Sequence, residues 1–287
     1  MNFPGIHRAG LESVPVKLAL LPLRGRSLFS RRPAAGGGGP VVSMTTYGKR
    51  LETAFFAIES IARGSLLPSR LILWIDETDV LARLPLPLRR LQERGLEILP
   101  TSNFGPHKKY FPYVQASNAF DRPLVTADDD VIYPQDWLEG LQRAYDARGD
   151  LIHCYRANVV KMDGDGFAPY RTWGRCSDTG ESFLNFATGV SGILYPPEFL
   201  AYLKRQGNGF LECCPRADDV WLHAAALRSG VMIKQVTSIW TEYPSIPDTQ
   251  DVALANTNLF GTGNDLQIGK TYLRQDVERL ILLATRQ

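Results

Sequence analysis

Short apolar runs alternate with amphipathic segments along the chain from residue 41 onwards. Runs rich in Val, Ile and Leu that are bounded by polar or turn-forming residues predict buried strands. Between them, apolar residues recur at intervals of three and four, as at Phe55, Ile58 and Ile61, which predicts helices. The strands expected on this basis cover residues 41–45, 70–76, 96–100 and 123–127.

Strands that alternate with helices at this spacing predict an α/β fold with a Rossmann-like, mostly parallel sheet flanked by helices. The clearest helix lies within residues 134–149, with Pro134 near its start and Gly149 after its end. A chain of 287 residues is long enough for one large domain of this kind or for two small ones. Because the regular pattern begins after residue 40, we expect a single globular domain over residues 41–287.

Residues 1–40 differ from the rest of the chain in charge and composition. They carry six Lys and Arg residues against one Glu, so a total net charge of +2 leaves −3 on the remainder. That remainder shows no basic stretch of the kind that nucleic-acid binding requires. The segment ends in the glycine-rich "PAAGGGGP", which is typical of a linker, and we expect residues 1–40 to form a flexible basic arm.

The apolar run "VKLALLPL" within this arm is too short to cross a membrane, and no small-residue cleavage site follows it. An alternative is that the basic and leucine residues of the arm contact anionic lipid. The four cysteines lack metal-type spacing and are interpreted as reduced thiols. These features predict a cytoplasmic protein, with peripheral contact at the inner face of the plasma membrane as the further possibility.

Three consecutive aspartates, Asp128, Asp129 and Asp130, follow the last predicted strand in "LVTADDDVIYP". Like charges in a row repel one another, and a single aspartate would suffice to cap the next helix, so an external cation is expected. Ligands of open α/β sheets bind at the carboxyl ends of strands, where this triplet lies. Carboxylate oxygens suit Mn²⁺ or Mg²⁺. On an extended segment, Asp128 and Asp130 would bind the metal while Asp129 faces away.

The stretches "VSMTTYGKR", "GPHKKYFP" and "ADDDVIYP" together resemble nucleotide-sugar glycosyltransferases of the type A fold. Within that fold they resemble a group of bacterial transferases that build surface polysaccharides. The resemblance extends over about residues 40–240. It implies one transferase domain, with a nucleotide-binding half at 41–133 and an acceptor-binding and catalytic half at 134–287. A departure is "WIDETD" after the second strand, where the largest inverting family has Asp-Asp-Gly-Ser.

The resemblance also implies roles for individual residues. The turn after the first strand would line a nucleotide pocket, and Asp76 would meet the base. Lys108 or Lys109 would neutralise diphosphate charge, although a solvated helix face is an alternative for both lysines. Asp128 and Asp130 would hold Mn²⁺ or Mg²⁺. The residues assigned to nucleotide binding are Thr45, Thr46, Tyr47, Arg50, Asp76, Lys108, Lys109, Asp128 and Asp129.

A second acidic pair, Asp218 and Asp219, opens an apolar helix that ends before Gly230. Carboxylates at a helix N-terminus are stabilised by the helix dipole, so capping explains one of the two. The pair resembles the acidic pair that type A enzymes place beside the acceptor. In an inverting transfer Asp219 would act as the general base that takes the acceptor proton, with Asp218 as the second candidate.

Together with these features, the resemblance implies a metal-dependent glycosyltransferase. It would move a sugar from a nucleotide-diphosphate sugar, expected to be UDP-linked, to a hydroxyl of a glycan or lipid-linked acceptor in surface polysaccharide synthesis. Inversion is expected, and retention at the same metal site is the alternative. A sugar-nucleotide pyrophosphorylase is one alternative, but it needs a Gly-rich phosphate loop after the first strand, and "TTYGKRLET" contains one Gly. The other is a non-catalytic carbohydrate- or nucleotide-binding protein, against which both acidic pairs argue.

Overall fold

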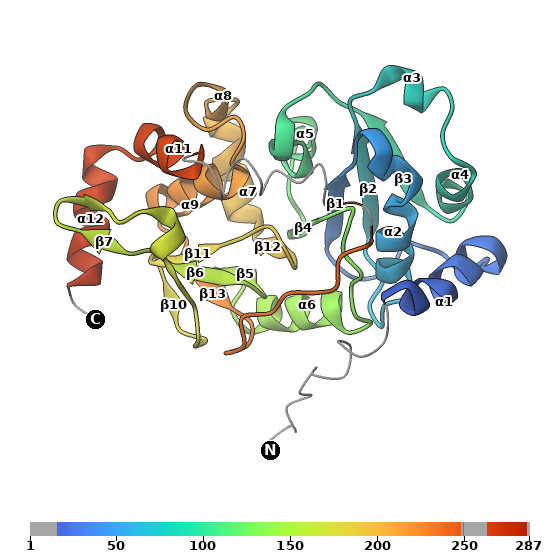
Figure 1. Ribbon diagram of the computed structural model, residues 1–287, viewed down its shortest axis with the longest axis horizontal. Helices are drawn as coiled ribbons and strands as arrows, with labels where there is room; N and C mark the ends of the chain where they lie inside the picture. Colours follow the sequence, from blue (N-terminus) through green and yellow to red (C-terminus); the bar gives the residue numbers. More distant parts are fainter. Residues whose placement is uncertain (1–15, 248, 250–262, 286–287) are drawn as a thin grey trace, which may run out of the picture.

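An eight-stranded sheet forms the centre of the molecule (Figure 1). The structure is a computed structural model that describes residues 16–247, 249 and 263–285. The strands of the central sheet are β1 (Val41–Thr45), β2 (Arg70–Ile75), β3 (Leu96–Pro100), β4 (Leu124–Ala127), β5 (Ile152–Cys154), β10 (Glu181–Ser182), β12 (Ile193–Tyr195) and β13 (Ile233–Gln235). They lie side by side in the order β10-β13-β5-β12-β4-β1-β2-β3.

The first four strands of the chain run parallel to one another. Strand β1 lies between β2 and β4, and β3 extends the sheet beyond β2. Strand β12 then pairs antiparallel with both β4 and β5, while β13 returns parallel to β5. The predicted α/β class with a mostly parallel sheet is confirmed. The boundary between halves at residue 133 stays a prediction, since the pairing of β4 with β12 makes the sheet continuous across it.

Helices cover both faces of this sheet, because successive strand side chains point to opposite faces. Val42 and Met44 pack into a core with the helices α1, α2, α4 and α6, whereas Val41 packs into a second core with α5, α7 and α9. The α-helices are α1 (Val16–Phe29), α2 (Ala54–Ala62), α3 (Thr78–Leu81), α4 (Leu86–Gln92), α5 (Phe111–Ala116), α6 (Trp137–Ala147), α7 (Pro197–Gln206), α8 (Phe210–Cys213), α9 (Asp218–Ser229), α11 (Gly263–Thr271) and α12 (Arg274–Ala284).

Short elements complete the described structure. A three-stranded sheet and a two-stranded hairpin lie outside the central sheet. Their strands are β6 (Ala157–Val159), β9 (Gly174–Arg175) and β11 (Asn185–Ala187) in the first, and β7 (Met162–Asp163) and β8 (Gly166–Phe167) in the second. The 3-10 helices are η2 (Gly48–Glu52), η3 (Gly105–Lys109) and η4 (Tyr170–Thr172).

The prediction of a flexible arm over residues 1–40 is wrong for residues 16–40, and residues 1–15 lie outside the described part. Helix α1 packs against α2 and α4, and its Leu23 is completely buried. The guanidinium of Arg26 reaches the buried carboxylate of Glu59 at 3.4 Å and donates to the Ala62 carbonyl at 3.2 Å. Helix α1 therefore covers one end of the core.

The glycine-rich segment that suggested a linker is instead closely packed. A β-carbon on Gly37 would lie 2.5 Å from the carbonyl oxygen of Leu67, and one on Gly39 would lie 2.7 Å from the same atom. Both glycines are thus needed for the close approach of two backbone segments. Composition alone does not separate this use of glycine from flexibility.

This packing predicts that Gly37→Ala lowers the free energy of unfolding by about 1–3 kcal/mol, because the new methyl group collides with backbone that cannot rotate away. Gly38→Ala is the matched control, since a β-carbon there meets nothing within 4 Å. It should change the stability by less than about 0.5 kcal/mol. Urea unfolding of both variants measures the difference, and equal midpoints would show that residues 36–39 are not packed in solution.

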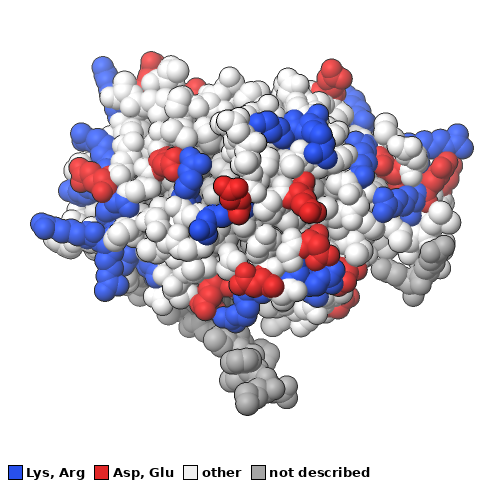
Figure 2. All heavy atoms as spheres, turned by 180° about the vertical axis from the view of Figure 1, so that it is seen from behind, with Lys and Arg blue, Asp and Glu red and all other residues white. Residues whose placement is uncertain are grey.

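The face seen in Figure 2 carries Lys and Arg side chains interspersed with Asp and Glu. Charges of both signs therefore alternate over this side of the molecule. Among the residues that the structure describes, no helix has both the length and the apolar character to cross a membrane. Contact of residues 1–40 with anionic lipid stays a prediction.

Candidate active site

Two adjoining cavities open at the carboxyl ends of β1, β2 and β4. The larger, of about 600 Å³, is bounded by the turn after β1, the end of β2, η3 and the triple aspartate. The smaller, of about 200 Å³, contains the second acidic pair and the loop at Gly189. We refer to them as the large and the small cavity. The side chains or backbone that line both are those of Pro106, Lys109, Asp128, Arg156, Val190 and Arg216.

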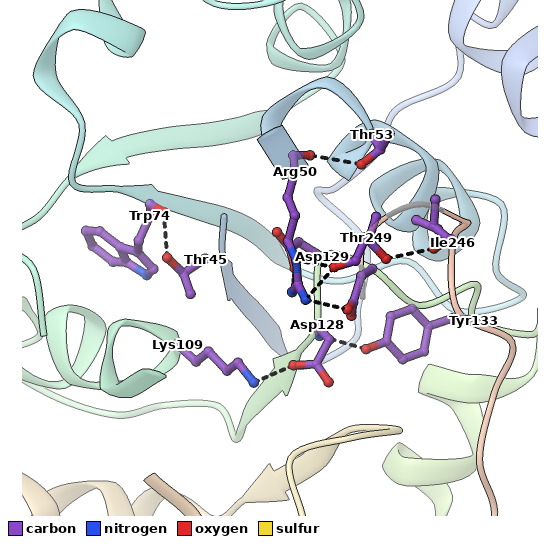
Figure 3. Close-up of polar contacts among 11 residues, drawn as sticks. Thr45, Arg50, Thr53, Trp74, Lys109, Asp128, Asp129, Tyr133, Ile246 and Thr249 are labelled. Atoms are coloured by element: carbon purple, nitrogen blue, oxygen red, sulfur yellow. Dashed lines mark hydrogen bonds and ion pairs between the residues drawn. The ribbon is translucent and has the colours of Figure 1, made fainter. Parts of the chain in front are cut away.

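Arg50 neutralises two of the three aspartates of the triplet. It projects from η2, and its guanidinium lies 3.0 Å from Asp129 Oδ1 (Figure 3). A second nitrogen of the same guanidinium lies 3.0 Å from Asp130 Oδ2. It also donates to the backbone carbonyl of Thr249. Burial opposes the charge of Arg50, but both carboxylates outweigh burial and raise its pKa. Arg50 lines the large cavity, but in this structure its guanidinium already contacts protein groups, and its role in nucleotide binding stays a prediction.

The other predicted residues at the end of β1 and just after it divide into two groups. Thr45 and Tyr47 line the large cavity, and the Thr45 hydroxyl donates to the Trp74 carbonyl at 3.0 Å (Figure 3). Thr46 is completely buried and is not among the lining residues of either cavity, so its predicted contact with a nucleotide is not supported by its position. Its hydroxyl lies beside Asp129 and lowers the pKa of that carboxyl, against the stronger effect of burial.

The triplet itself forms a turn and is not extended as expected. Strand β4 ends at Ala127, and the backbone turns at Asp129 and Asp130. The turn is held by hydrogen bonds from the Asp128 N–H to Tyr133 Oη at 2.7 Å and from the Ile246 N–H to the Asp130 carbonyl at 2.7 Å. The alternation that would turn Asp129 away needs an extended backbone, so all three aspartates line the large cavity.

A divalent cation fits the chemistry of this turn. Burial raises the pKa of Asp130 to about 6, and the neighbouring Asp128 carboxylate adds to the rise. In the described part of the chain, no group of three or more His, Cys, Asp or Glu side chains could hold a metal ion alone. Magnesium is commonly bound by one or two carboxylates together with water and phosphate oxygens. The turn could supply those carboxylates, and a bound phosphate would complete the site.

The two lysines of η3 form ion pairs with different carboxylates. Lys108 Nζ lies 2.5 Å from Asp76 Oδ1, and only 4% of the lysine side chain is exposed, so a solvated helix face is the wrong interpretation of Lys108. Lys109 pairs with Asp128 (Figure 3). Burial opposes the charge of Lys109, but the carboxylates of Asp128, Asp218 and Asp219 outweigh burial and raise its pKa. Lys109 therefore connects the two acidic groups electrostatically.

Asp218 and Asp219 occupy the first turn of α9 and line the small cavity. Asp219 Oδ1 accepts a hydrogen bond from the Gly189 N–H at 2.9 Å, so this carboxylate is oriented by a distant loop. Burial and the neighbouring Asp218 raise the pKa of Asp219 well above its ordinary value. A β-carbon on Gly189 would lie 3.3 Å from Asp219 Oδ1, so a larger residue there would press on this carboxylate. A partly buried carboxylate with a raised pKa is suited to proton transfer.

Some cavity residues were absent from the sequence prediction. Arg156 follows β5, and the rule that ligands bind at the carboxyl ends of strands could have indicated it. Arg216, Glu242 and Ser245 come from loops whose sequences show no distinguishing pattern. Glu242 and Ser245 reach the site because the chain after β13 returns to the triplet, where Val131 pairs with Ser245, whereas Arg216 lies just before α9.

No protein-family model matches this chain, and no curated protein matches it either. Among solved structures the chain is similar to residues 1–349 of TarS from S. aureus, with 14% identity and a TM-score of 0.47, over 74% of this chain and 60% of that one. It is also similar to 4-diphosphocytidyl-2C-methyl-D-erythritol synthase from Anaerococcus prevotii, with 15% identity and a TM-score of 0.47, over 77% and 97% of the two chains.

A third similar structure is CMP:2-keto-3-deoxy-manno-octonic acid synthetase in complex with CTP. The identity is 11% and the TM-score is 0.44, and the match covers 77% of this chain and 98% of that one. The chain thus spans 60% of the TarS segment and almost the full length of the two synthetases.

Proposed function

We propose that this protein is a metal-dependent glycosyltransferase that uses a nucleotide-diphosphate sugar. The observation that carries the proposal is the pair of adjoining cavities. The large one contains the triple aspartate, and the small one contains Asp219 with a raised pKa and a fixed orientation. A transfer between two substrates needs one pocket for a charged donor and a second pocket with a base for the acceptor.

In this proposal the nucleotide lies in the large cavity, near Tyr47 and the Lys108–Asp76 pair, with its diphosphate beside the triple aspartate. The acceptor lies in the small cavity. A Mn²⁺ or Mg²⁺ ion held by Asp128 and Asp130 would offset the charge of the leaving nucleoside diphosphate. The UDP-linked donor, the glycan or lipid-linked acceptor, the role in surface polysaccharide synthesis and the cytoplasmic location stay predictions.

The chemical step assigned to the chain is proton transfer at Asp219. The acceptor oxygen forms a bond to the anomeric carbon while the bond from that carbon to the phosphate oxygen breaks. The acceptor proton passes to the Asp219 carboxylate, and the leaving diphosphate keeps the electron pair. The Gly189 N–H holds the carboxylate in place, and Lys109 favours its ionised form. Attack from the side opposite the leaving group inverts the anomeric configuration.

The pyrophosphorylase alternative is less well supported by the same geometry. Such an enzyme needs phosphate-binding groups in the turn after β1, but Arg50 in this region is held by Asp129 and Asp130. It also has no use for a base in a separate cavity. A screen of nucleotide sugars for metal-dependent transfer, with the product's anomeric configuration determined by NMR, tests the proposal. Release of pyrophosphate from a nucleoside triphosphate and a sugar phosphate would favour the alternative.

The metal site gives a separate prediction. Binding of a nucleoside diphosphate to the native protein should strengthen about tenfold or more when Mn²⁺ or Mg²⁺ is added, because the ion joins phosphate and carboxylate oxygens. Asp130→Asn should lose this enhancement. Asp76→Asn is the matched control, since it removes one charge from the same cavity at a distance from the turn, and it should keep the enhancement. Calorimetry with and without chelator measures it, and unchanged metal dependence in Asp130→Asn would contradict the site.

A further inference from the structure

Arg156 differs from Arg50, Lys108 and Lys109, which also line the large cavity, in how its charge is compensated. Arg50, Lys108 and Lys109 each lie within 3.0 Å of a carboxylate oxygen. Arg156 Nη1 approaches a carboxylate only at 3.5 Å, and its partner Glu242 has a side chain that is 57% exposed. Among the described residues, the buried Nε of Arg156 finds no hydrogen-bond acceptor. Arg156 therefore keeps donors that the described part of the chain does not fill.

The Arg156 side chain is nevertheless held in one place. Its guanidinium carbon lies 4.1 Å from the ring centroid of Trp240, and 15% of the side chain is exposed. The Trp240 indole is itself fixed, because its Nε1–H donates to Asn158 Oδ1 at 3.2 Å. Stacking on an aromatic ring uses the face of the guanidinium and leaves its in-plane N–H groups available. An unfilled, pre-positioned fork of donors is suited to an anion.

The position of Arg156 indicates which anion this is. It lines both cavities together with Lys109 and Asp128, so it lies where the donor and acceptor pockets meet. In a sugar transfer, the phosphate oxygen that the sugar leaves must lie at this junction. Phosphate oxygens match the planar guanidinium fork in geometry as well as in charge.

We propose that Arg156, held on Trp240, binds the terminal phosphate of the nucleoside diphosphate and stabilises the negative charge that this phosphate gains as the sugar departs. This inference rests on the proposed function, because it takes the ligand of the large cavity to be a nucleoside diphosphate. Glu242 competes with that phosphate for the same guanidinium.

Binding measurements with diphosphates and monophosphates test this role. Calorimetry on the full chain with Mn²⁺ would use UDP, CDP, GDP and ADP, each paired with its monophosphate. Arg156→Ala should weaken binding of the preferred diphosphate by about 10- to 100-fold, since a charge-assisted hydrogen bond is lost, and leave its monophosphate within about twofold. Arg156→Lys keeps the charge but loses the fork, and should give an intermediate loss. Glu242→Gln removes the competitor and should tighten diphosphate binding.

Arg175→Ala is the matched control. The Arg175 guanidinium also lies 4.1 Å from the Trp240 ring centroid, but this residue is exposed and lines neither cavity. Its removal should leave binding of both nucleotides unchanged, and thermal unfolding of all variants shows whether they remain folded.

If native protein and Arg156→Ala bind the diphosphate equally, the role of Arg156 is overturned while the proposed function stands. That result is expected if Arg156 binds an anionic acceptor instead. An equal loss for both nucleotides would also overturn the role of Arg156. Native protein that binds none of the diphosphates would overturn the proposed function as well.

Discussion

Replacing Asp219 by Asn is expected to lower the rate of sugar transfer by about 100-fold or more, while the affinity for donor and metal stays unchanged. The amide keeps the shape of the carboxylate and can still accept the hydrogen bond that the Gly189 N–H makes to Asp219 Oδ1. It cannot take the proton of the acceptor hydroxyl. Steady-state transfer rates, together with donor binding by calorimetry, separate these two effects.

Asp218→Asn is the matched control for this experiment, because the two aspartates are adjacent in the first turn of α9. If the pair only stabilised the helix start, both variants would lose about 1 kcal/mol or less of stability and keep their turnover. Measuring thermal unfolding beside the transfer rate distinguishes catalysis from helix stabilisation. Near-native transfer by both variants would remove the inverting-base mechanism and favour a retaining enzyme.

The raised pKa of Asp219 adds a prediction for the pH dependence of transfer. Burial and Asp218 disfavour the charged form, so the base is protonated at a higher pH than an ordinary aspartate. The rate of transfer should therefore fall as the pH drops through this raised pKa and reach its full value above it. Asp218→Asn removes one of the two causes and should move the acid limb of the rate profile to lower pH. An acid limb in the ordinary range of aspartate for the native protein would contradict this.

The second large effect is expected in stability, at the buried carboxylate of Glu59. Glu59 is completely buried in α2, and Arg94, with 6% of its side chain exposed, donates to it through both terminal nitrogens. Arg94→Met should lower the free energy of unfolding by about 3–5 kcal/mol, because among the described residues it leaves the buried carboxylate with only the longer contact to Arg26. Urea unfolding measures this loss, which is a large part of the stability of an ordinary domain.

The double variant Glu59→Met/Arg94→Met provides the control. It removes both charges and replaces them with apolar groups, so it should be much more stable than Arg94→Met alone. Such a result would show that the loss comes from the unpaired charge and not from altered packing around α1, α2 and α4. A loss below about 1 kcal/mol in the single variant would mean that Arg26 or water compensates Glu59.

The sequence by itself determined the parallel half of the sheet and the location of the two acidic groups. The strands at 41–45 and 96–100 match β1 and β3, because apolar runs bounded by turn residues are a local signal. The same locality placed Asp128–Asp130 after β4 and Asp218 at the start of α9. Hydrophobic burial decides these features over a few neighbouring residues, so a local pattern is sufficient to predict them.

Only the tertiary structure decided how the charged residues of the site are paired. Arg50 and Asp129 are 79 positions apart, and the loop of Gly189 orients a carboxylate 30 positions later. Arg156 gains its place from Trp240, which lies far along the chain. Charge pairing depends on distances between segments that come together only on folding, and sequence periodicity carries no information about those distances. The glycines before β1 show the same limit, since close backbone contact and flexibility require the same residue.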